Sequence, residues 1–573
     1  MKKNVCAFLV ACSLNIMAFA QHNSQSWGDL GNGKFRNQIL PADYCDPDVL
    51  RIGKDYYLIS STFQFSPGIV IMHSNDLVNW KTIGSVVKNL PLELKDNRFD
   101  YTVMDHYSKG IYAPSLKYHH KQFWVYFTTY NKGGIYVATA SKITGPWKVE
   151  LMKDKNGKEL FGLNWDDPCP LWDDDGKNYL VASHPGSNWY PILFQLSADG
   201  KQLLDGEVEK MAAEKIGTIG TGTHIYPKAT WGEGNKIFKK DGYYYLFHNE
   251  CFGKDYDRRA VMIRSKNIYG THADGKAGSP GNPGKYDVSP QGTSTYVMVQ
   301  PDSTGGRFDQ GSIIDDPTGK KWYFLTHQGG GTNNGRPISL LPVKWIDGWP
   351  MAGSDYNHDG IGEPVWELPM PVVGGKKSFP QGSDEFNHPQ LHPQWMWNYQ
   401  PRSDKWSLSH RKGFLRLYAF KPLPNNYNPF FKAGNTIGQR YVKSDSVTAT
   451  IKMDISGMEN GQEAGLAHYN GGSDYASIGI IQNEKGRFLK FTENWKINLG
   501  IAINSNTIWL KSIVNNKGIN QYYYSINGVD YIPFGPTYTL KWGGYRGDNI
   551  GMYSFNNQNE SGFVDINWFH YQF

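Results

Sequence analysis

The chain has 573 residues, which is too long for one compact hydrophobic core and predicts two domains. Tyrosine, tryptophan and glycine occur 36, 19 and 63 times, a composition that favours short strands joined by tight turns. The net charge of +6 is weak for this length and no basic run stands out, so nucleic acid is not an expected partner.

The N-terminus carries the features of an export signal. Two lysines precede a mostly apolar stretch that ends in the small-x-small motif AFA at residues 18–20. We therefore expect residues 1–20 to be a signal peptide and the mature chain to be periplasmic or extracellular. The motif LVAC at residues 9–12 offers an alternative, a lipoprotein anchored at Cys12, although the apolar run continues past this cysteine.

Beyond the signal, the sequence predicts neither a membrane span nor a disulfide framework. No later stretch is long and apolar enough to cross a bilayer. Of the 5 cysteines, the mature chain would keep Cys45, Cys169 and Cys251, which is an odd number for an exported protein. No disulfide pairing can be assigned from these three residues.

A short strand-like phrase recurs five times before residue 350. Each copy is an aromatic and aliphatic strand that follows a turn, and successive copies lie 55 to 78 residues apart. The copies are KDYYLIS at Tyr57, KQFWVYF at Trp124, KNYLVAS at Tyr179, GYYYLFHN at Tyr245 and KKWYFLTH at Tyr323. Five strand-rich units of this size predict a five-bladed β-propeller. A helical solenoid is disfavoured because the phrase lacks a 3.6-residue period.

A different strand pattern follows the repeat. Residues 362–383 are rich in Pro and Gly and are predicted to form a linker. Strands such as SVTATIKMD from Ser446 then continue without the repeat. We therefore expect an all-β protein, with a propeller over residues 33–361 and a β-sandwich over residues 384–573.

Three acidic residues precede the recurring strands of three different blades. Asp167 and Glu233 each stand 12 residues before the tyrosine of their repeat, and Asp46 stands at a similar distance before the first one. The inner strands of a propeller converge on a central funnel, so these acids are predicted to meet there. Hydrolysis of a glycosidic bond needs two carboxyl groups, one to donate a proton and one to activate water or to attack.

The motifs around these acids resemble glycoside hydrolase family 43, specifically its β-xylosidases and α-L-arabinofuranosidases. The resemblance begins with NQILPADYCDPDVL at residues 37–50 and continues through DDPCPLWDDDGKNYL, EGNKIFKKDGYYYL and GRPISLLPVKW. In the tail, GFLRLY, EAGLAHYN and YYYSINGVDY resemble the concanavalin-like or jelly-roll-like sandwich found at the C-terminus of β-xylosidases. Nearly the whole mature chain is covered by this resemblance.

The resemblance implies an inverting hydrolase in which three carboxyl groups have separate roles. Asp46 matches the general base that activates water, and Glu233 matches the general acid. Asp167 matches the third acid, which orients the general acid and adjusts its pKa, with neighbouring Asp166 as a rival. Asp48 is expected to cap its own turn.

Pro47 follows the predicted base directly. Its ring fixes its own φ and disfavours helical conformations in the residue before it. We therefore expect Asp46 to have an extended backbone that aims its carboxylate into the funnel.

Four further residues correspond to sugar-binding positions of the family. Arg336 matches the substrate-binding arginine, with a surface turn as the alternative interpretation. Phe63 and Tyr112 match aromatic pocket walls, with ordinary blade packing as the alternative. Gln310 stands where many relatives carry a central histidine, and its amide binds a hydroxyl but is a poorer metal ligand.

No cofactor is required by this chemistry, and no metal-ligating residues are assigned. Gln310 makes a central calcium doubtful. The segment from Asp355 to Glu363 begins like a calcium-binding loop, but the twelfth position of that loop is Trp366 rather than Glu. A polar turn is therefore the favoured interpretation, and a structural calcium is the alternative.

These features predict an exo-acting enzyme that removes terminal pentoses from plant cell-wall oligosaccharides. A β-D-xylosidase is favoured, and an α-L-arabinofuranosidase or a bifunctional enzyme is the alternative, because the two sugars present similar hydroxyls. A non-catalytic glycan-binding protein is a more distant alternative, since binding alone does not need three positioned carboxyls. The expected partner is a xylo- or arabino-oligosaccharide, and the sequence assigns no oligomeric state.

Overall fold

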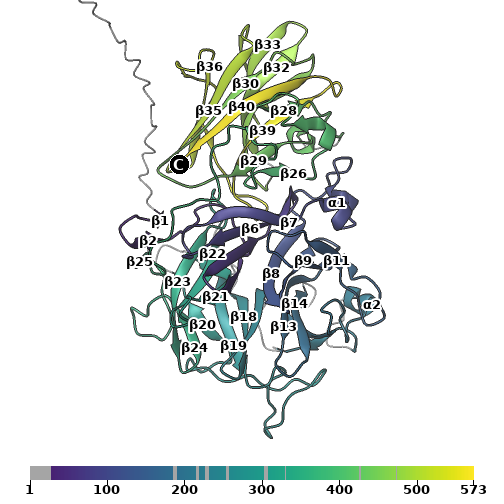
Figure 1. Ribbon diagram of the computed structural model, residues 1–573, viewed down its shortest axis with the longest axis vertical. Helices are drawn as coiled ribbons and strands as arrows, with labels where there is room; N and C mark the ends of the chain where they lie inside the picture. The colour runs from purple at the N-terminus through teal and green to yellow at the C-terminus, as the bar shows by residue number, and fades with distance from the viewer. Residues whose placement is uncertain are drawn as a thin grey trace, which may run out of the picture.

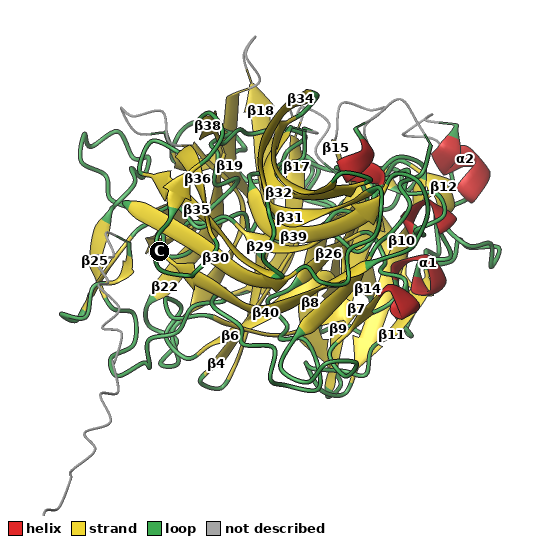
Figure 2. Cartoon of the chain, turned by 90° about the horizontal axis from the view of Figure 1, so that it is seen from above, coloured by secondary structure: helices red, strands yellow, loops and turns green. Residues whose placement is uncertain are grey.

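The fold was analysed in a computed structural model of the chain. The structure describes residues 27–184, 190–213, 219–225, 232–252, 257–301, 307–329, 331–424, 428–472 and 474–573, so the predicted export signal lies outside it. Strands dominate the described residues (Figure 2), which include two short α-helices, α1 (Leu90–Glu93) and α2 (Val208–Ala212). The prediction of an all-β protein is confirmed.

Five antiparallel sheets follow one another in the first part of the described chain. The first contains β3 (Asp48–Ile52), β4 (Asp55–Ser60), β6 (Gly68–Ser74) and β7 (Lys81–Val87). The second contains β8 (Ile111–His119), β9 (Gln122–Thr129), β10 (Gly133–Ala140) and β11 (Lys148–Leu151), and β12 (Phe161–Leu163) pairs with β10. The third contains β13 (Asp166–Trp172), β14 (Asn178–His184), β15 (Tyr190–Leu196) and β16 (Thr223–His224).

The last two sheets complete the series. The fourth contains β17 (Gly232–Lys240), β18 (Tyr243–Phe252), β19 (Asp257–Ser265) and β20 (Tyr296–Val299). The fifth contains β21 (Arg307–Asp315), β22 (Trp322–Gly329), β23 (Ile338–Ile346) and β24 (Trp349–Ala352). The first strands touch in cyclic order, β3 with β8, β8 with β13, β13 with β17, β17 with β21, and β21 with β3. The sheets therefore form a closed ring, the arrangement of a β-propeller.

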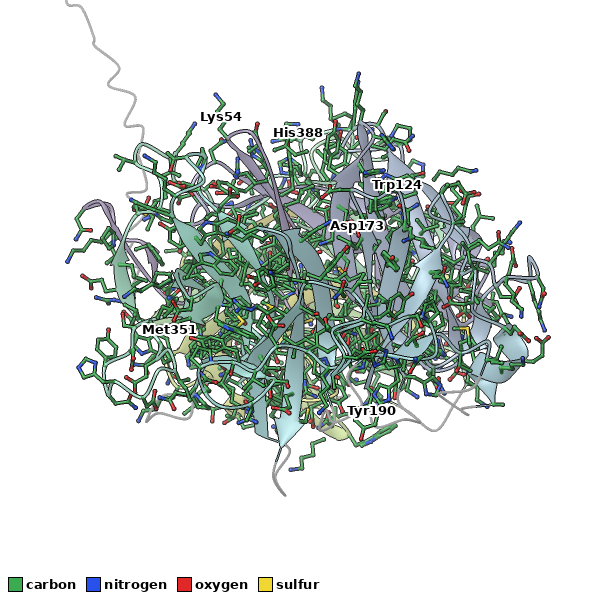
Figure 3. All side chains as sticks on the ribbon, turned by 90° about the horizontal axis from the view of Figure 1, so that it is seen from below. Lys54, Trp124, Asp173, Tyr190, Met351 and His388 are labelled. Atoms are coloured by element: carbon green, nitrogen blue, oxygen red, sulfur yellow. The ribbon has the colours of Figure 1, made fainter. Side chains whose placement is uncertain are left out.

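The recurring aromatic strands fill the gaps between neighbouring sheets. On β9, Val125 and Phe127 belong to the apolar cluster shared with the first sheet, whereas Trp124 and Tyr126 belong to the cluster shared with the third. Successive side chains of a strand point to opposite faces, so a strand packed between two sheets is apolar on both. Met351 of β24 and Trp124 lie on opposite sides of the molecule when it is seen from below (Figure 3).

Two large sheets form a sandwich in the last part of the chain. One contains β34 (Lys496–Ala502), β33 (Gly486–Glu493), β32 (Tyr475–Asn483), β31 (Gln462–Tyr469), β39 (Asn549–Asn556), β29 (Ile437–Arg440), β26 (Met396–Asn398) and β5 (Phe65–Ser66). The other contains β27 (Trp406–Ser407), β28 (Leu415–Tyr418), β40 (Phe563–Gln572), β30 (Ser446–Asp454), β35 (Thr507–Asn515), β36 (Ile519–Ser525), β37 (Ile532–Pro533) and β38 (Tyr538–Thr539). Figure 1 shows the sandwich, green to yellow, stacked on the ring.

The ring and the sandwich are joined by shared sheets. Strand β5 comes from the loop between β4 and β6 of the first propeller sheet, yet it pairs with β26 of the sandwich. A further small sheet contains β1 (Gly28–Asp29), β2 (Lys34–Arg36) and β25 (Glu367–Pro369). Because β25 lies within the predicted linker, this segment is hydrogen-bonded to the ring rather than free of it. The pairing of β5 with β26 holds the sandwich against the ring.

Candidate active site

A cavity of about 120 Å³ opens where the first strands of the sheets begin. The three predicted catalytic acids, Asp46, Asp167 and Glu233, all line it. Asp46 stands just before β3, Asp167 is the second residue of β13, and Glu233 is the second residue of β17. The structure therefore brings these acids together from the first, third and fourth sheets.

Three of the four predicted sugar-binding residues, Arg336, Tyr112 and Gln310, also line the cavity. Phe63 is not part of its wall. The side chain of Phe63 is fully buried and lies behind Tyr112, with ring centroids 4.4 Å apart. The amide oxygen of Gln310 has no hydrogen-bond partner among the described residues, which leaves it available to a sugar hydroxyl.

A β-bulge recurs at the same place in four of the first strands. The register shifts between Tyr112 and Ser115, Asp166 and Cys169, Glu233 and Lys236, and Phe308 and Gly311. A bulge inserts an extra residue, bends the strand and re-aims its side chains. The recurring bulge explains how strands of different sheets present acids to one cavity.

The backbone of Asp46 differs from the expected extended conformation. Asp46 has a φ of 52°, in the left-handed region, and Asp167 has the same value. Both residues precede a proline. The prediction of an extended backbone for Asp46 is therefore wrong. Aspartate is one of the few residues that tolerate left-handed backbone, and such conformations persist where the surrounding structure enforces them. Contacts with Ser61, His327 and Arg336, rather than Pro47 alone, therefore set the direction of the Asp46 carboxylate.

Both carboxylate oxygens of Asp46 are held by donors. Nη1 of Arg336 donates to Oδ1 at 2.7 Å, and the Ser61 hydroxyl donates to Oδ2 at 2.6 Å. The backbone N–H of Asp46 donates to Nδ1 of His327 at 2.9 Å. Burial raises the pKa of Asp46, but the positive charge of Arg336 and the other donors outweigh burial and place this pKa below its ordinary value. Asp46 is therefore an ionised carboxylate in the resting site.

Asp166 and Asp167 form a second acidic group on the opposite wall. Asp167 Oδ2 accepts the backbone N–H of Gly234 at 2.7 Å, and Asp166 Oδ1 accepts the hydroxyl of Thr128 at 3.1 Å. Burial, followed by the negative charge of Glu233, raises the pKa of Asp166, while burial and the charge of Asp166 raise the pKa of Asp167. These two carboxyls therefore hold a proton more readily than Asp46 does.

Glu233 and Asp167 share the same sequence offset but not the same position on their strands. Glu233 pairs with Asn249 at the start of its bulge, and Asp166 pairs with Ser183 at the start of the bulge in β13. Glu233 is thus the counterpart of Asp166. Asp167, one residue further, is the counterpart of Gly234, whose backbone N–H it accepts.

Four residues of the site were not predicted from the sequence. Arg258 forms an ion pair with Glu233, and the buried His327 accepts the N–H of Asp46. Tyr130 and Tyr545 line the cavity, and Tyr545 belongs to the sandwich part of the chain. His327 ends the recurring phrase KKWYFLTH, whereas the other three belong to no acid–proline or aromatic-strand motif. In all four cases, the pairing that brings the residue to the site appears only in the folded chain.

The segment predicted to be a polar turn is held by its own carboxylates. Asp355 accepts the backbone N–H groups of Asp359 and Gly360, and Glu363 accepts that of Tyr356. Among the residues that the structure describes, no group of three or more His, Cys, Asp or Glu side chains is arranged to hold a metal ion. Within the same residues, no helix is long and apolar enough to cross a membrane.

The chain matches two known sequence families. Residues 35–350 match glycosyl hydrolases family 43, and residues 383–572 match the β-xylosidase C-terminal concanavalin A-like domain. A β-xylosidase from Formosa agariphila is 32% identical, with 97% of this chain and 93% of the relative covered. A non-reducing end α-L-arabinofuranosidase from Bacteroides ovatus is 28% identical, with 76% and 74% covered.

Solved structures agree with this assignment. A mutant of the family 43 protein BlXynB from Bacillus licheniformis has a TM-score of 0.76 and 25% identity, with 94% of this chain and 99% of that chain covered. The ring, the sandwich and the convergent carboxyls are thus those of a glycosidase. The chain belongs to glycoside hydrolase family 43.

Asp48 provides a test of how the site is built. Asp48 does not line the cavity; its carboxylate accepts the N–H of Leu116 on β8 at 2.7 Å and the hydroxyl of Ser312 on β21. Beyond its expected contact with its own turn, it therefore ties three first strands together. We expect Asp48→Asn to keep most activity and to lose about 1 kcal/mol of unfolding free energy.

The matched variant is Asp46→Asn. It should keep the fold and lose at least about 10²-fold in kcat/KM, because a positioned acid–base group typically contributes that much. Steady-state kinetics and denaturant unfolding of both variants measure the two effects. An inactive but folded Asp48→Asn variant would contradict this assignment.

Proposed function

We propose that the protein is an exo-acting, inverting β-D-xylosidase that releases single xylose units from plant cell-wall oligosaccharides. The observation that carries the proposal is the pairing of an ionised carboxylate, Asp46, with raised-pKa carboxyls across one small cavity. Inverting hydrolysis needs such a pair of environments, one for the base and one for the acid. The similarity to β-xylosidases over nearly the whole chain supports xylose as the sugar.

The size of the cavity supports exo-action. Its volume of about 120 Å³ is small compared with the roughly 300–1,000 Å³ of pockets for drug-sized ligands. Tyr545 of the sandwich stands at the wall and is 61% exposed, so the sandwich limits the space beside the sugar. A cavity of this size, bounded by the sandwich at Tyr545, suits a chain end better than an internal segment of a polysaccharide.

In the proposed reaction, Asp46 takes a proton from the attacking water and Glu233 gives a proton to the leaving oxygen. Arg336 keeps Asp46 ionised. Glu233 is ion-paired with Arg258 in the free enzyme. We therefore infer that sugar binding separates Glu233 from Arg258, so that its carboxyl can reach the leaving oxygen.

The same site could serve an α-L-arabinofuranosidase, which is the second candidate. The similarity to such an enzyme from Bacteroides ovatus favours it.

We also propose that the chain is exported through the signal at residues 1–20, with anchoring at Cys12 as the alternative.

Comparing aryl β-D-xyloside with aryl α-L-arabinofuranoside tests the proposed specificity. We expect the xyloside to have the higher kcat/KM and xylo-oligosaccharides to shorten by one xylose at a time. Higher kcat/KM on the arabinofuranoside would assign the second candidate instead. Early release of long fragments from xylan would refute exo-action. If the enzyme hydrolysed neither aryl glycoside, its assignment as a glycosidase acting on pentosides would be refuted.

Glu233→Ala tests the general acid. Because aryl groups with a low pKa leave without a proton, this variant should lose much less activity on such substrates than on xylobiose. Asp46→Ala should lose activity on both kinds of substrate equally, because no other group would activate the water. The ratio of kcat/KM values on an activated aryl xyloside and on xylobiose measures the difference. Equal losses for both substrates in Glu233→Ala would remove the support for its role.

Asp166→Asn tests the electrostatic role of the acidic pair. The negative charge of Asp166 raises the pKa of Asp167, and the charges of Asp166 and Glu233 repel each other. Removing that charge should lower the pKa of Asp167, so this carboxyl loses its proton at a lower pH. We expect the alkaline limb of the kcat/KM profile to move to lower pH while the acid limb stays in place. An unchanged alkaline limb would show that Asp166 does not tune the acid.

A further inference from the structure

A turn of the sandwich is inserted deeply into the ring beside the catalytic base. The turn is formed by residues 543–547, in which Gly543 and Arg546 are bridged. A Cβ atom on Gly547 would lie 2.2 Å from the backbone nitrogen of Gly335, and one on Gly335 would lie 2.4 Å from Asp43 Cβ. The two backbones can approach this closely only because both positions are glycine.

This turn carries an arginine that binds the ring through one carboxylate. Nε of Arg546 donates to Asp43 Oδ2 at 2.5 Å, and the backbone N–H of Gly547 donates to the same oxygen at 3.3 Å. The other oxygen, Asp43 Oδ1, accepts the backbone N–H of Arg336 at 3.1 Å. Asp43 thus connects an arginine of the sandwich with the arginine that holds the base Asp46.

Burial and ring contacts fix this chain of groups further. Arg546 is 1% exposed, and its guanidinium lies 4.4 Å from the centroid of Phe63. The guanidinium of Arg336 lies 5.9 Å from the same ring. Both guanidiniums therefore lie near the ring of Phe63.

Burying the Arg546–Asp43 ion pair costs desolvation free energy. Both charges of the Arg546–Asp43 pair are removed from water, and Nη1 and Nη2 of Arg546 have no hydrogen-bond partner among the described residues. A buried ion pair is often no more stabilising than apolar residues of the same volume, so stability alone does not account for it. Fixing the position of a catalytic group is a use that apolar packing would not supply.

We propose that Arg546 is a positioning residue for the reaction, which holds the Arg336 guanidinium against the Asp46 carboxylate through Asp43. The sandwich is then a necessary part of the active site and not only a cover for it. This inference rests on the proposed role of Asp46 as the base. Without the link, Arg336 shifts, Asp46 loses part of its positive neighbour, and its carboxylate is harder to keep ionised.

Other charged groups also act on Asp46, and they come from several elements. His327 and Arg258 favour its ionised form, whereas the carboxyl of Asp166 and the buried thiol of Cys45 are negative or neutral neighbours. Of these groups, Cys45 also experiences the charge of Arg546. The hydrogen-bonded route from Arg546 to Asp46 runs through Asp43 and Arg336.

Arg546→Met is the first test, measured as the pH profile of kcat/KM on an aryl β-D-xyloside. We expect the acid limb to move up by about one pH unit, because a close positive charge typically lowers a carboxyl pKa by one to three units. We also expect kcat/KM at the optimum to fall roughly 10- to 100-fold, as misplacement of a catalytic group does. KM should change less than kcat.

Arg440→Met is the matched control. Arg440 is also a buried arginine of the sandwich; it donates to the backbone oxygen of Asp43 at 2.7 Å and lies 4.4 Å from the ring centroid of Tyr44. Its hydrogen bond goes to the backbone of Asp43, and it acts on the Asp43 carboxylate through charge alone. We expect this variant to lose stability without any movement of the acid limb. An equal movement of the limb in both variants would show a general effect of the interface and would overturn the proposal.

The double variant Asp43→Leu/Arg546→Met separates stability from positioning. Removing both charges avoids the uncompensated carboxylate that Arg546→Met leaves, so the thermal midpoint should recover relative to the single variant. The acid limb should remain displaced, because Arg336 still lacks its anchor. If Arg546→Met does not fold, this variant decides the question alone.

The proposal and the proposed function fail in different ways. An acid limb that stays at its original pH in the double variant, or returns there as stability recovers, would overturn the positioning role. Full activity of Asp46→Asn would instead overturn the base assignment, whatever the Arg546 variants do.

Discussion

The buried ion pair between Arg336 and Asp46 is the interaction on which the rest of the site depends. A carboxylate that is 3% exposed stays ionised only if a positive charge and hydrogen-bond donors compensate for the loss of water. Arg336 and Ser61 supply that compensation directly, and His327 orients the backbone of Asp46. An ionised base at the wall of the cavity is what activation of a water molecule requires.

The ring explains how one chain can place carboxyls of opposite character a short distance apart. Its first strands meet around a common axis, and bulges at equivalent places turn one or two side chains of each strand into the same cavity. Asp46 faces an arginine, whereas Asp166 and Asp167 face each other. Two environments, and therefore two kinds of acid, arise from one repeated backbone geometry.

The sandwich takes part in this geometry as well as covering it. Tyr545 stands at the cavity wall, and Arg546, the next residue, is directed to Asp43 beneath it. A single turn thus limits the space for the sugar and anchors the arginine that holds the base. This explains why the two parts of the chain share strands and buried charges.

Sequence patterns predicted the elements of the fold and the acids, because these have local signatures. The aromatic strands repeat along the chain, and Asp46 and Asp167 stand in Asp-Pro motifs. Counting residues from each acid to the tyrosine of its repeat made Glu233 and Asp167 look equivalent. The strand pairing instead makes Glu233 the counterpart of Asp166. The bulge is alike in both strands, and the difference arises in the turn that follows, since Leu171 pairs with Tyr179 across a turn one residue longer than the one between Phe238 and Tyr245.

Other features could not be predicted because they join distant parts of the chain. Arg546 and Asp43 are separated by 503 residues, and His327 and Asp46 by 281. Neither pair has a local motif. The left-handed backbone of Asp46 was missed for a related reason, since the proline rule describes the chain alone and not the contacts that Asp46 makes with His327 and Arg336. Phe63 was placed in the wall from its family position, while packing puts it behind.

The stereochemistry of hydrolysis tests the central claim most directly. If Asp46 is a base that activates water, each turnover inverts the anomeric carbon, and proton NMR during the first minutes should show α-xylose forming first from an aryl β-D-xyloside. The β-anomer should appear only later, through mutarotation. Initial formation of β-xylose would mean that a carboxylate attacks the sugar itself, and would contradict the role assigned to the Asp46–Arg336 pair.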